Sequence, residues 1–539
     1  MEAGTPGNRS AVRVKLTSPT PSETAVTPWL REMLPLLHVL RDFFIRCEAT
    51  AYLVGGFPRD ALLGRLTLDV DVAVKGNAVV LAKQLANEIG GTFVLLDESR
   101  GIARVVLHSP REWQGGLTEK EEGFSKKQKR VDLSSFSGDI EQDMARRDFT
   151  IDALAIPLDA ALHETLLGAG LSKATEKLID PFYGLGDLSA ETIKAVSDHA
   201  FQDDPVRLLR AVRLSAQLGF SIDGRTRDLI ERDSHLLSSV APERLRDELL
   251  KTLAEPKATV HVRLMDELGL LCRLIPELEV ARDVEQPKEH YWDVFYHCLE
   301  TPGHVERLIT EEGRAGDDII SYSPWLPSLK EYFKEEVSDG HTRLTIIKLT
   351  GLLHDISKPV TKFIDPTGRM RFFGHDIQGA EVCQEVLSRL RLSSRGINLI
   401  STMVRHHLRP TQMSQAVDLP SQRATYRYFR DLGEAAVDTL YLNMADYLSA
   451  KGPRIEIDDW QGHCNLISHI LHMGLDPEGA PKKTPRLVDG HLLMETLGLP
   501  AGALVGRLLE AIQEAHGAGE ISTREEALQL ASRLVAAEK

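Results

Sequence analysis

The chain has 539 residues, of which 42% are hydrophobic and 27% are charged, and its formal net charge is −15. This length exceeds one ordinary core and predicts three or four domains, and the lack of any run of about 18 apolar residues argues against a transmembrane helix. The acidic balance taken alone also argues against a nucleic-acid partner, so only local patterning can favour one.

Two features of the sequence concern where the protein resides. Segment 1–28 is rich in Pro, Ser, Thr and Gly and lacks the apolar stretch of a secretory signal, so we expect a disordered tail. The five cysteines are scattered and form no CxxC pair. That usage favours a reducing compartment, here the cytoplasm, and argues against a cysteine zinc site.

The first part of the chain alternates β-branched runs with helical patterns. Strands are predicted over 51–56, 69–75, 91–97, 103–109 and 130–136, helices over 58–64 and 78–90, and a polar insertion over 111–129. From about residue 180 the amphipathic period of 3.6 continues, interrupted at 311–328 and 473–486. This layout predicts an α+β head with a mixed sheet, followed by a long all-α body.

Two carboxylates, Asp69 and Asp71, lie two residues apart in one of these strands. Residues at that spacing point to the same face of a sheet, so the two charges repel each other. A divalent cation between them removes the repulsion, and oxygen ligands suit Mg²⁺. A third carboxylate is expected from a neighbouring strand, with Asp132 as the candidate and Asp97 as its rival.

A paired-glycine turn precedes these aspartates. Gly55 and Gly56 join a strand to a helix, an arrangement that presents backbone N–H groups and a helix N-terminus to a phosphate. Arg59 and Arg65 add positive charge. Metal, phosphate cradle and arginine together equip a site for phosphoryl or nucleotidyl transfer, whereas an isolated aspartate pair would more often be a solvated strand end.

The pattern GG-x-x-RD-x-x-LG-x-x-x-x-D-x-D over 55–71 resembles the signature of the class II tRNA nucleotidyltransferase / poly(A) polymerase family, which belongs to the polymerase-beta-like nucleotidyltransferase superfamily. The stretch "EQDMARRDFTIDALAI" resembles the second motif of that family. The resemblance implies that Arg146, Arg147 and Asp148 lie on a helix and contact the ribose and phosphates of the nucleotide. The family usually has Asn where this chain has Asp152.

The stretch "FQDDPVRLLRAVRL" resembles the motif with which this family selects the incoming base without a template, with Asp203 in place of its usual Glu. Asp204 would accept from an exocyclic amine and Arg207 would donate to the neighbouring ring nitrogen. Cytosine and adenine both present that edge, whereas uracil and guanine do not. Arg210 and Arg213 would face the triphosphate. A helix start held by salt bridges is the alternative for this stretch alone.

Two further segments resemble family motifs with supporting roles. "LIDPFYGLGDLSAETIKAV" resembles the hinge between head and neck, in which Asp180 and the turns at Gly184 and Gly186 would allow movement. "PERLRDELL" over 242–250 resembles a helix that braces the base-selecting helix.

Histidines and carboxylates further along the chain resemble the HD phosphohydrolase superfamily. Imidazoles and carboxylates that converge from separate helices are metal ligands by chemistry, so a second divalent metal is expected here. Whether this site hydrolyses a substrate stays open. The candidate ligands are His297, His354, Asp355, His375, His406 or His407, and Asp446.

These resemblances imply a nucleotidyltransferase head over 29–180, a helical neck over 181–280, an HD body over 281–472 and a tRNA-binding tail over 473–539. They imply an enzyme that builds or repairs the 3′-CCA end of tRNA from CTP and ATP, with Mg²⁺ on Asp69, Asp71 and Asp132. No membrane and no protein partner are predicted.

Two alternatives stay open. Complete CCA-adding members carry a flexible loop between the third-carboxylate strand and the second motif, whereas Asp132 and Arg146 are only 14 positions apart (146 − 132). A CC-adding, A-adding or poly(A)-adding enzyme of the same family is therefore an alternative. The other is an HD-domain phosphohydrolase that acts on RNA 3′ ends or nucleotides, with a head that only binds RNA.

Overall fold

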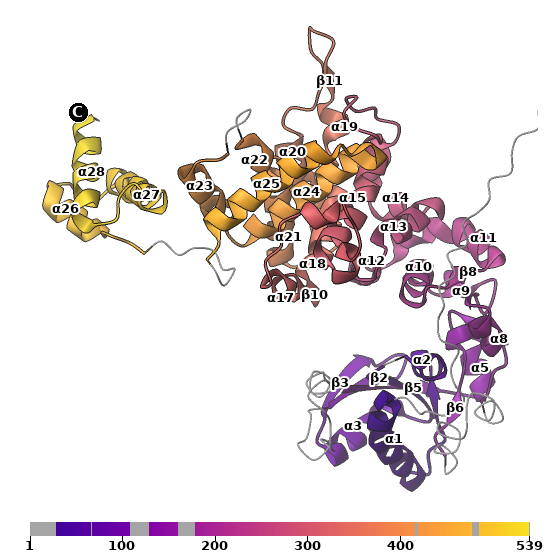
Figure 1. Cartoon of the computed structure of the whole chain (residues 1–539). Helices are drawn as coiled ribbons and strands as arrows, with labels where there is room; N and C mark the ends of the chain where they lie inside the picture. Colours follow the sequence, from indigo (N-terminus) through magenta and orange to yellow (C-terminus); the bar gives the residue numbers. More distant parts are fainter. Residues whose placement is uncertain are drawn as a thin grey trace, which may run out of the picture. The chain divides into compact units, whose positions relative to one another are not determined.

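The computed structural model describes residues 28–65, 67–107, 129–159, 178–414, 419–476 and 485–537. The predicted disordered tail lies outside these residues except for Pro28, and so do most of the insertion at 111–129 and the middle of the linker at 473–486. The chain divides into two compact units, Met1–Ser197 and Asp198–Lys539, which Figure 1 shows from indigo to yellow. Each unit is described by itself.

The first unit is built on a six-stranded mixed sheet with the order β3-β4-β5-β2-β1-β6. Strands β2 and β5 pair in parallel, and the other neighbours pair antiparallel. The five predicted strands are confirmed to within two residues, whereas the two-residue β6 was not predicted because it is too short to show a period. The strands are β1 (Ala51–Val54), β2 (Asp69–Lys75), β3 (Thr92–Asp97), β4 (Ile102–Leu107), β5 (Lys129–Phe136) and β6 (Ile156–Pro157).

One face of this sheet is covered by α1 (Pro28–Arg46) and α3 (Ala78–Ile89), as Figure 1 shows. Val70, Val72 and Val74 of β2 face these helices and belong to the largest core of the head. Because side chains alternate along a strand, Asp69 and Asp71 point to the opposite face. Shorter elements follow: α2 (Gly56–Leu62), α5 (Ile140–Met144), the 3₁₀ turn Thr150–Asp152, α8 (Gly184–Ser189) and β7 (Thr192–Ile193).

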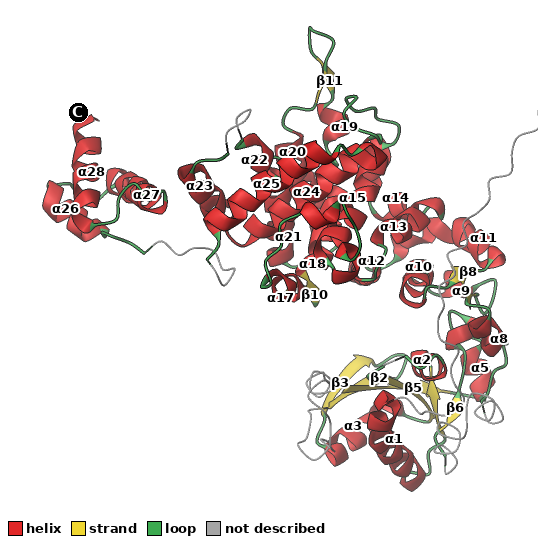
Figure 2. Cartoon of the chain, in the orientation of Figure 1, coloured by secondary structure: helices red, strands yellow, loops and turns green. Residues whose placement is uncertain are grey.

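The second unit is almost entirely helical, as predicted and as Figure 2 shows. Its first part contains α9 (Ala200–Asp203), α10 (Arg207–Leu218), β8 (Ser221–Ile222), α11 (Gly224–Asp233), α12 (Pro242–Ala254), α13 (Ala258–Glu267) and α14 (Leu271–Leu274). The second part contains α15 (Val294–Ile309), α16 (Glu311–Arg314), α17 (Leu329–Lys334), β9 (Glu336–Ser338), β10 (His341–Thr342), α18 (Arg343–Leu353), α19 (Lys358–Thr361), β11 (Phe363–Ile364), β12 (Met370–Arg371), α20 (His375–Arg389), α21 (Ser394–His406), α22 (Arg409–Gln412), α23 (Gln422–Leu432), α24 (Ala436–Lys451) and α25 (Ile457–Gly474).

Helix α18 lies at the centre of this bundle. Almost all of its side chains are buried, which is the pattern of a helix surrounded by others rather than of an amphipathic surface helix. Helices α15 and α24 pack against it. The candidate HD residues His297, His354, Asp355 and Asp446 lie on or directly after these three helices, so they lie in the interior of the unit.

The chain ends in α26 (Gly490–Leu497), α27 (Ala503–Gly517) and α28 (Arg524–Ala537), which share a small core of their own around Leu493, Leu508 and Ile512. Ion pairs between α23 and α27 join this tail to the body, among them Arg427 with Glu514 at 2.5 Å. Among the described residues, no helix combines the length and apolarity that crossing a membrane requires.

Candidate functional site

The parallel pairing of β2 and β5 brings two of the predicted carboxylates together. Asp71 and Asp132 are direct register partners, and both point away from the core helices. Asp97 ends β3, which β4 and β5 separate from β2. Its carboxylate instead accepts from the Ser99 hydroxyl and the Arg100 N–H of its own turn. The sheet order therefore places Asp132, and not Asp97, beside the aspartate pair.

Arg104 of β4 holds the Asp132 carboxylate. Its Nε donates to Oδ1 at 2.7 Å and its Nη2 to Oδ2 at 2.8 Å, and the two residues are cross-strand partners. This hydrogen bonding raises the pKa of the Arg104 guanidinium, with smaller contributions from the charges of Asp69 and Asp71. Among the described residues, the three aspartates do not form a group of ligand atoms close enough for one ion. Asp132 is thus engaged with Arg104, and Asp69 and Asp71 remain the predicted magnesium ligands.

The glycine turn lies against Asp71. Gly55 has φ +68°, and a Cβ at this position would lie 2.6 Å from Asp71 Oδ2 and 3.1 Å from Arg147 Nη1. The left-handed backbone and the close approach of both side chains each require glycine here. The turn, Asp71 and Arg147 therefore converge at one point on the face of the sheet opposite to α1 and α3.

Arg59 was predicted to contribute positive charge to a phosphate site, whereas the structure shows its guanidinium bound to two aspartates. Its side chain is buried, with Nε and Nη2 donating to Asp60 and Nη1 donating to Asp152 at 2.6 Å. A buried guanidinium requires such partners because losing hydration is costly. Asp152, the residue that departs from the family pattern, supplies one of them. Arg59 thus braces the turn, and its Nη2 lies 3.2 Å from the position of a Cβ on Gly56.

The Arg146-Arg147-Asp148 triplet does not lie on a helix, and that expectation was wrong. Helix α5 ends at Met144, and the triplet occupies the turns that follow. Both arginines pair with Asp143, at 2.7 Å and 3.3 Å. Asp148 is buried and accepts from the N–H of the next residue.

The segment that is predicted to select the base is held by α12. The Asp204 carboxylate accepts from both terminal nitrogens of Arg244, at 3.0 Å and 2.7 Å. Arg207 donates to the Ala200 carbonyl at 3.0 Å. Arg213 pairs with Glu248 at 2.7 Å, so it is bound to the bracing helix instead of standing free for a triphosphate. The bracing role predicted for 242–250 is confirmed.

Two further residues of this segment and the predicted hinge complete the picture of the site residues. Asp203 is exposed at the end of α9, and Arg210 is half-buried on α10. In the predicted hinge, Asp180 accepts from the N–H groups of Gly184 and the next residue, at 2.7 Å and 3.0 Å. A Cβ on Gly184 would lie 2.2 Å from the Thr150 carbonyl, so close packing requires this glycine.

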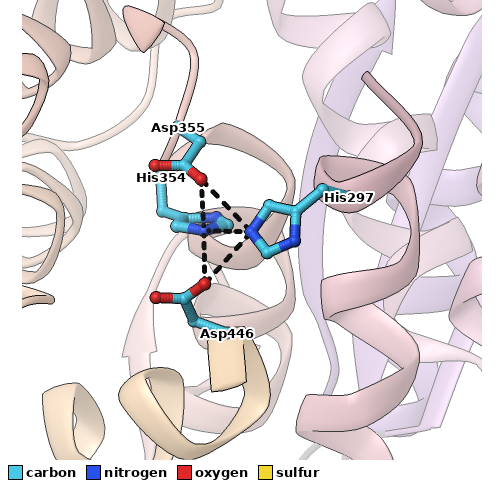
Figure 3. Close-up of side chains that lie close together, drawn as sticks. All are labelled: His297, His354, Asp355 and Asp446. Atoms are coloured by element: carbon cyan, nitrogen blue, oxygen red, sulfur yellow. Dashed lines mark hydrogen bonds and ion pairs between the residues drawn. The ribbon is translucent and has the colours of Figure 1, made fainter. Parts of the chain in front are cut away.

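The HD residues form two adjoining groups that share Asp355. Figure 3 shows the first, in which His297, His354, Asp355 and Asp446 converge. The Nε2 of His297 lies 3.1 Å from His354 Nε2, 3.2 Å from Asp355 Oδ2 and 3.1 Å from Asp446 Oδ1.

The second group places His375 and His407 on the other oxygen of Asp355, at 3.4 Å and 3.7 Å. His406 belongs to neither group, because successive residues of a helix are rotated by about 100°. Of the two alternatives His406 and His407, the structure therefore places His407 in a ligand group.

The electrostatics of these groups fit a divalent cation. Burial lowers the pKa of His354, but the charges of Asp355 and Asp446 prevail and raise it to about 10. Burial also disfavours the charged Asp355 carboxylate, yet His354 and Lys358 hold its pKa well below the ordinary value. The Nε2 atoms of His375 and His407 are buried without a hydrogen-bond partner, which a metal ion between them and Asp355 would supply. This donor set fits a divalent metal.

Comparison with known proteins gives the same division of the chain. The family models for the poly A polymerase head domain, for a probable RNA- and SrmB-binding site of polymerase A, and for the HD domain match residues 51–194, 219–282 and 294–451. Together with the paired aspartates on the head sheet and the His–Asp groups in the body, these matches define a nucleotidyltransferase with a fused HD domain.

Individual relatives indicate to which family of nucleotidyltransferases the chain belongs. An A-adding tRNA nucleotidyltransferase of Deinococcus radiodurans and a CC-adding one of Thermus thermophilus are each 29% identical, over 90% of this chain and 95% and 94% of theirs. A multifunctional CCA protein of Neisseria gonorrhoeae is 30% identical over 68% of this chain and 75% of its own. The chain belongs to the class II tRNA nucleotidyltransferase / poly(A) polymerase family. The Thermotoga maritima CCA-adding enzyme complexed with tRNA shares the fold, with 23% identity, 95% and 96% coverage and a TM-score of 0.57.

Proposed function

We propose that the protein completes or repairs the 3′-CCA end of tRNA in the cytoplasm, using CTP and ATP. The observation that carries this proposal is the convergence of Asp71, the Gly55 turn and Arg147 on the face of the head sheet opposite to α1 and α3. In a chain of this family, such an arrangement suits a nucleoside triphosphate whose phosphates meet a cation, backbone N–H groups and an arginine.

In this proposal Asp69 and Asp71 hold Mg²⁺, which supplies a Lewis acid for nucleotidyl transfer to the tRNA 3′-hydroxyl. The Gly55-Gly56 turn donates backbone hydrogen bonds to the phosphates. Arg147 compensates their charge. Asp132 is the candidate third carboxylate, and Arg104 holds it beside the aspartate pair.

Selection of the base is assigned to the second unit. Asp204 accepts from the exocyclic amine of cytosine or adenine, and Arg207 donates to the adjacent ring nitrogen. Arg244 fixes the orientation of the Asp204 carboxylate through two hydrogen bonds. The selecting acceptor is therefore pre-oriented before a nucleotide arrives.

A partial activity, addition of CC or of A alone, is the second candidate. It is favoured by the relatives named above that match about nine tenths of the chain, because both carry names for such partial activities. The HD groups suggest a further candidate, metal-dependent hydrolysis of a phosphate ester, since their donor set fits a divalent metal.

The test is an extension assay with tRNA transcripts that end at the discriminator base, in C, or in CC, each supplied with the four nucleotides one at a time and with CTP and ATP together. A complete enzyme extends the first transcript by three residues. A CC-adding enzyme stops after two, and an A-adding enzyme extends only the transcript ending in CC. Incorporation of UTP or GTP, or no incorporation at all, would contradict the proposal.

The Asp69→Asn variant separates the two sites. It should lose nucleotide addition with all three transcripts, while any release of phosphate from RNA 3′ ends or nucleotides by the HD body persists. Nucleotide addition that survives this substitution would show that the metal lies elsewhere.

A further inference from the structure

A β-hairpin in the HD body begins and ends at the metal-capable groups. Its strands β11 and β12 pair Phe363 with Arg371. The segment starts at Lys358, whose Nζ lies 2.6 Å from Asp355 Oδ2, and returns to His375, which faces the other oxygen of the same carboxylate. We call residues 358–377 the aromatic hairpin; it is labelled at β11 in Figure 1.

Large apolar side chains are exposed along this short segment. Phe363 and Phe373 are 43% and 71% exposed as residues, and their ring centroids lie 5.7 Å apart at an interplanar angle of 41°. Among the described residues, they are the two phenylalanines that rank as exposed large hydrophobics. Val360, Ile364 and Ile377 are exposed beside them in sequence. Single exposed hydrophobics are normal, but several within one short segment mark a binding surface.

The aromatic hairpin is basic in an acidic protein. From 358 to 377 it carries Lys358, Lys362, Arg369 and Arg371 against Asp365 and Asp376, which gives +2 (4 − 2) in a chain with a net charge of −15. Lys358 is paired with Asp355 and Arg371 with Asp365. Cations interleaved with exposed aromatic rings are the pattern that binds unpaired nucleotides, because bases stack on the rings and phosphates meet the cations. A purely apolar protein partner would not need these charges.

The turn of the hairpin is ordered by its own hydrogen bonds. Asp365 accepts from the hydroxyl and the N–H of Thr367 and from the N–H of Arg369. A platform that is fixed before binding loses less conformational entropy when a ligand arrives.

We propose that the aromatic hairpin binds an unpaired RNA end, stacking its bases on Phe363 and Phe373 and leading its phosphate to the groups around Asp355. This site lies in the HD body, whereas the proposed nucleotide-addition site lies in the head. The RNA-binding proposal can therefore be tested independently of the proposed CCA synthesis. The ligand class is single-stranded RNA with a terminal phosphate.

The test uses the full chain and a fluorescein-labelled six-nucleotide RNA that ends in a 3′-phosphate, which cannot be extended by the head. Binding is measured by fluorescence anisotropy. Phe363→Ala and Phe373→Ala should each weaken binding by about 5- to 150-fold, the range typical for loss of one stacked base. Tyr322→Ala, at an aromatic ring that is 45% exposed elsewhere in the body, is the matched control and should bind like the wild type.

Two further variants distinguish stacking from apolar docking. Phe373→Trp should keep the wild-type affinity, whereas Phe373→Leu should be as weak as Phe373→Ala because it keeps an apolar surface without a ring face. Cross-linking of a 4-thiouridine-labelled RNA to the wild type, mapped by mass spectrometry, should label residues 358–377. Unchanged RNA binding in both alanine variants, or cross-links only outside this range, would overturn the proposal. So would a wild-type dimer that both alanine variants convert to monomers, since the surface would then bind a second copy.

Discussion

Substituting Gly55 with alanine tests whether the glycine turn positions Asp71, the proposed magnesium ligand. The added Cβ would lie 2.6 Å from Asp71 Oδ2, whereas ordinary contacts begin at 3.4 Å, so the carboxylate must retreat by about 0.8 Å (3.4 − 2.6). Misplacement of a reacting group by about 1 Å costs about 100-fold in rate. We therefore expect Gly55→Ala to lower kcat/KM for nucleotide addition by about that factor.

Gly55→Ala should also strain the backbone, and this loss of stability has to be separated from the displacement of Asp71. Gly55 has φ +68°, and a non-glycine residue there costs roughly 1–3 kcal/mol of stability. Gly90 ends α3 with φ +67°, and a Cβ added there would meet no atom within 4 Å, so it imposes backbone strain without a collision. Gly90→Ala should therefore lower the free energy of unfolding by about 1–2 kcal/mol and leave nucleotide addition almost unchanged.

The assay is steady-state incorporation of CMP and AMP into tRNA, alongside urea unfolding of both variants. If Gly55→Ala folds and turns over within about threefold of Gly90→Ala, the turn does not set the position of Asp71 and the reasoning fails. A titration of Mg²⁺ against the rate gives an independent measure, because a displaced Asp71 should also raise the Mg²⁺ concentration required for half-maximal rate.

Three further predictions concern other parts of the chain. Arg244→Ala removes the two hydrogen bonds that orient Asp204, so misincorporation of UMP and GMP should rise about tenfold, corresponding to about 1.4 kcal/mol of lost discrimination. His407→Ala removes a candidate ligand and should lower the affinity of the HD body for Mn²⁺ at least about tenfold by calorimetry, whereas His406→Ala should not. Arg343→Ala removes the guanidinium that lies 2.9 Å from the fully buried carboxylate of Asp438. The free energy of unfolding in urea should therefore fall by about 3–5 kcal/mol.

Each of these predictions has a control and a contradicting result. Arg227→Ala removes a half-buried arginine of the same unit that pairs with Glu267, and its error rate should match the wild type. An equal rise in both variants would show that Arg244 acts by general destabilisation. Equal loss of Mn²⁺ binding in both histidine variants would refute the assignment of His407. For Arg343, a loss below about 1 kcal/mol would show that water reaches the pair.

The sequence predicted the elements that depend on local periodicity, and it missed contacts between distant residues. Alternation within the strand placed Asp69 and Asp71 on one face, and the parallel partner strand supplied Asp132. The pairs of Arg59 with Asp152, Arg104 with Asp132 and Arg244 with Asp204 span 93, 28 and 40 positions. Spacing along the chain carries no information on such partners. One clue was present, because Asp152 departs from the family's Asn.

The choice between His406 and His407 shows a second limit of sequence reasoning. Both histidines fit the order of the HD motif, and both lie at the end of the same helical pattern. Only the rotation of α21 about its axis directs one of them to Asp355, and that rotation is set by packing against α18, α20 and α24. Periodicity predicts a buried face but is too coarse to separate adjacent residues at a helix end.

Two arginine–aspartate pairs of the head differ in how much free energy is lost when the aspartate leaves its arginine. The side chains of Arg59 and Asp152 are 6% and 2% exposed, and breaking such a pair would leave a buried charge at a cost of about 3–5 kcal/mol. The side chains of Arg104 and Asp132 are 32% and 23% exposed, and pairs that solvent screens contribute only about 0–1 kcal/mol. In the proposed function, Asp132 is therefore the carboxylate that can leave its arginine at little cost, while Arg59 keeps its partners and the glycine turn keeps its shape.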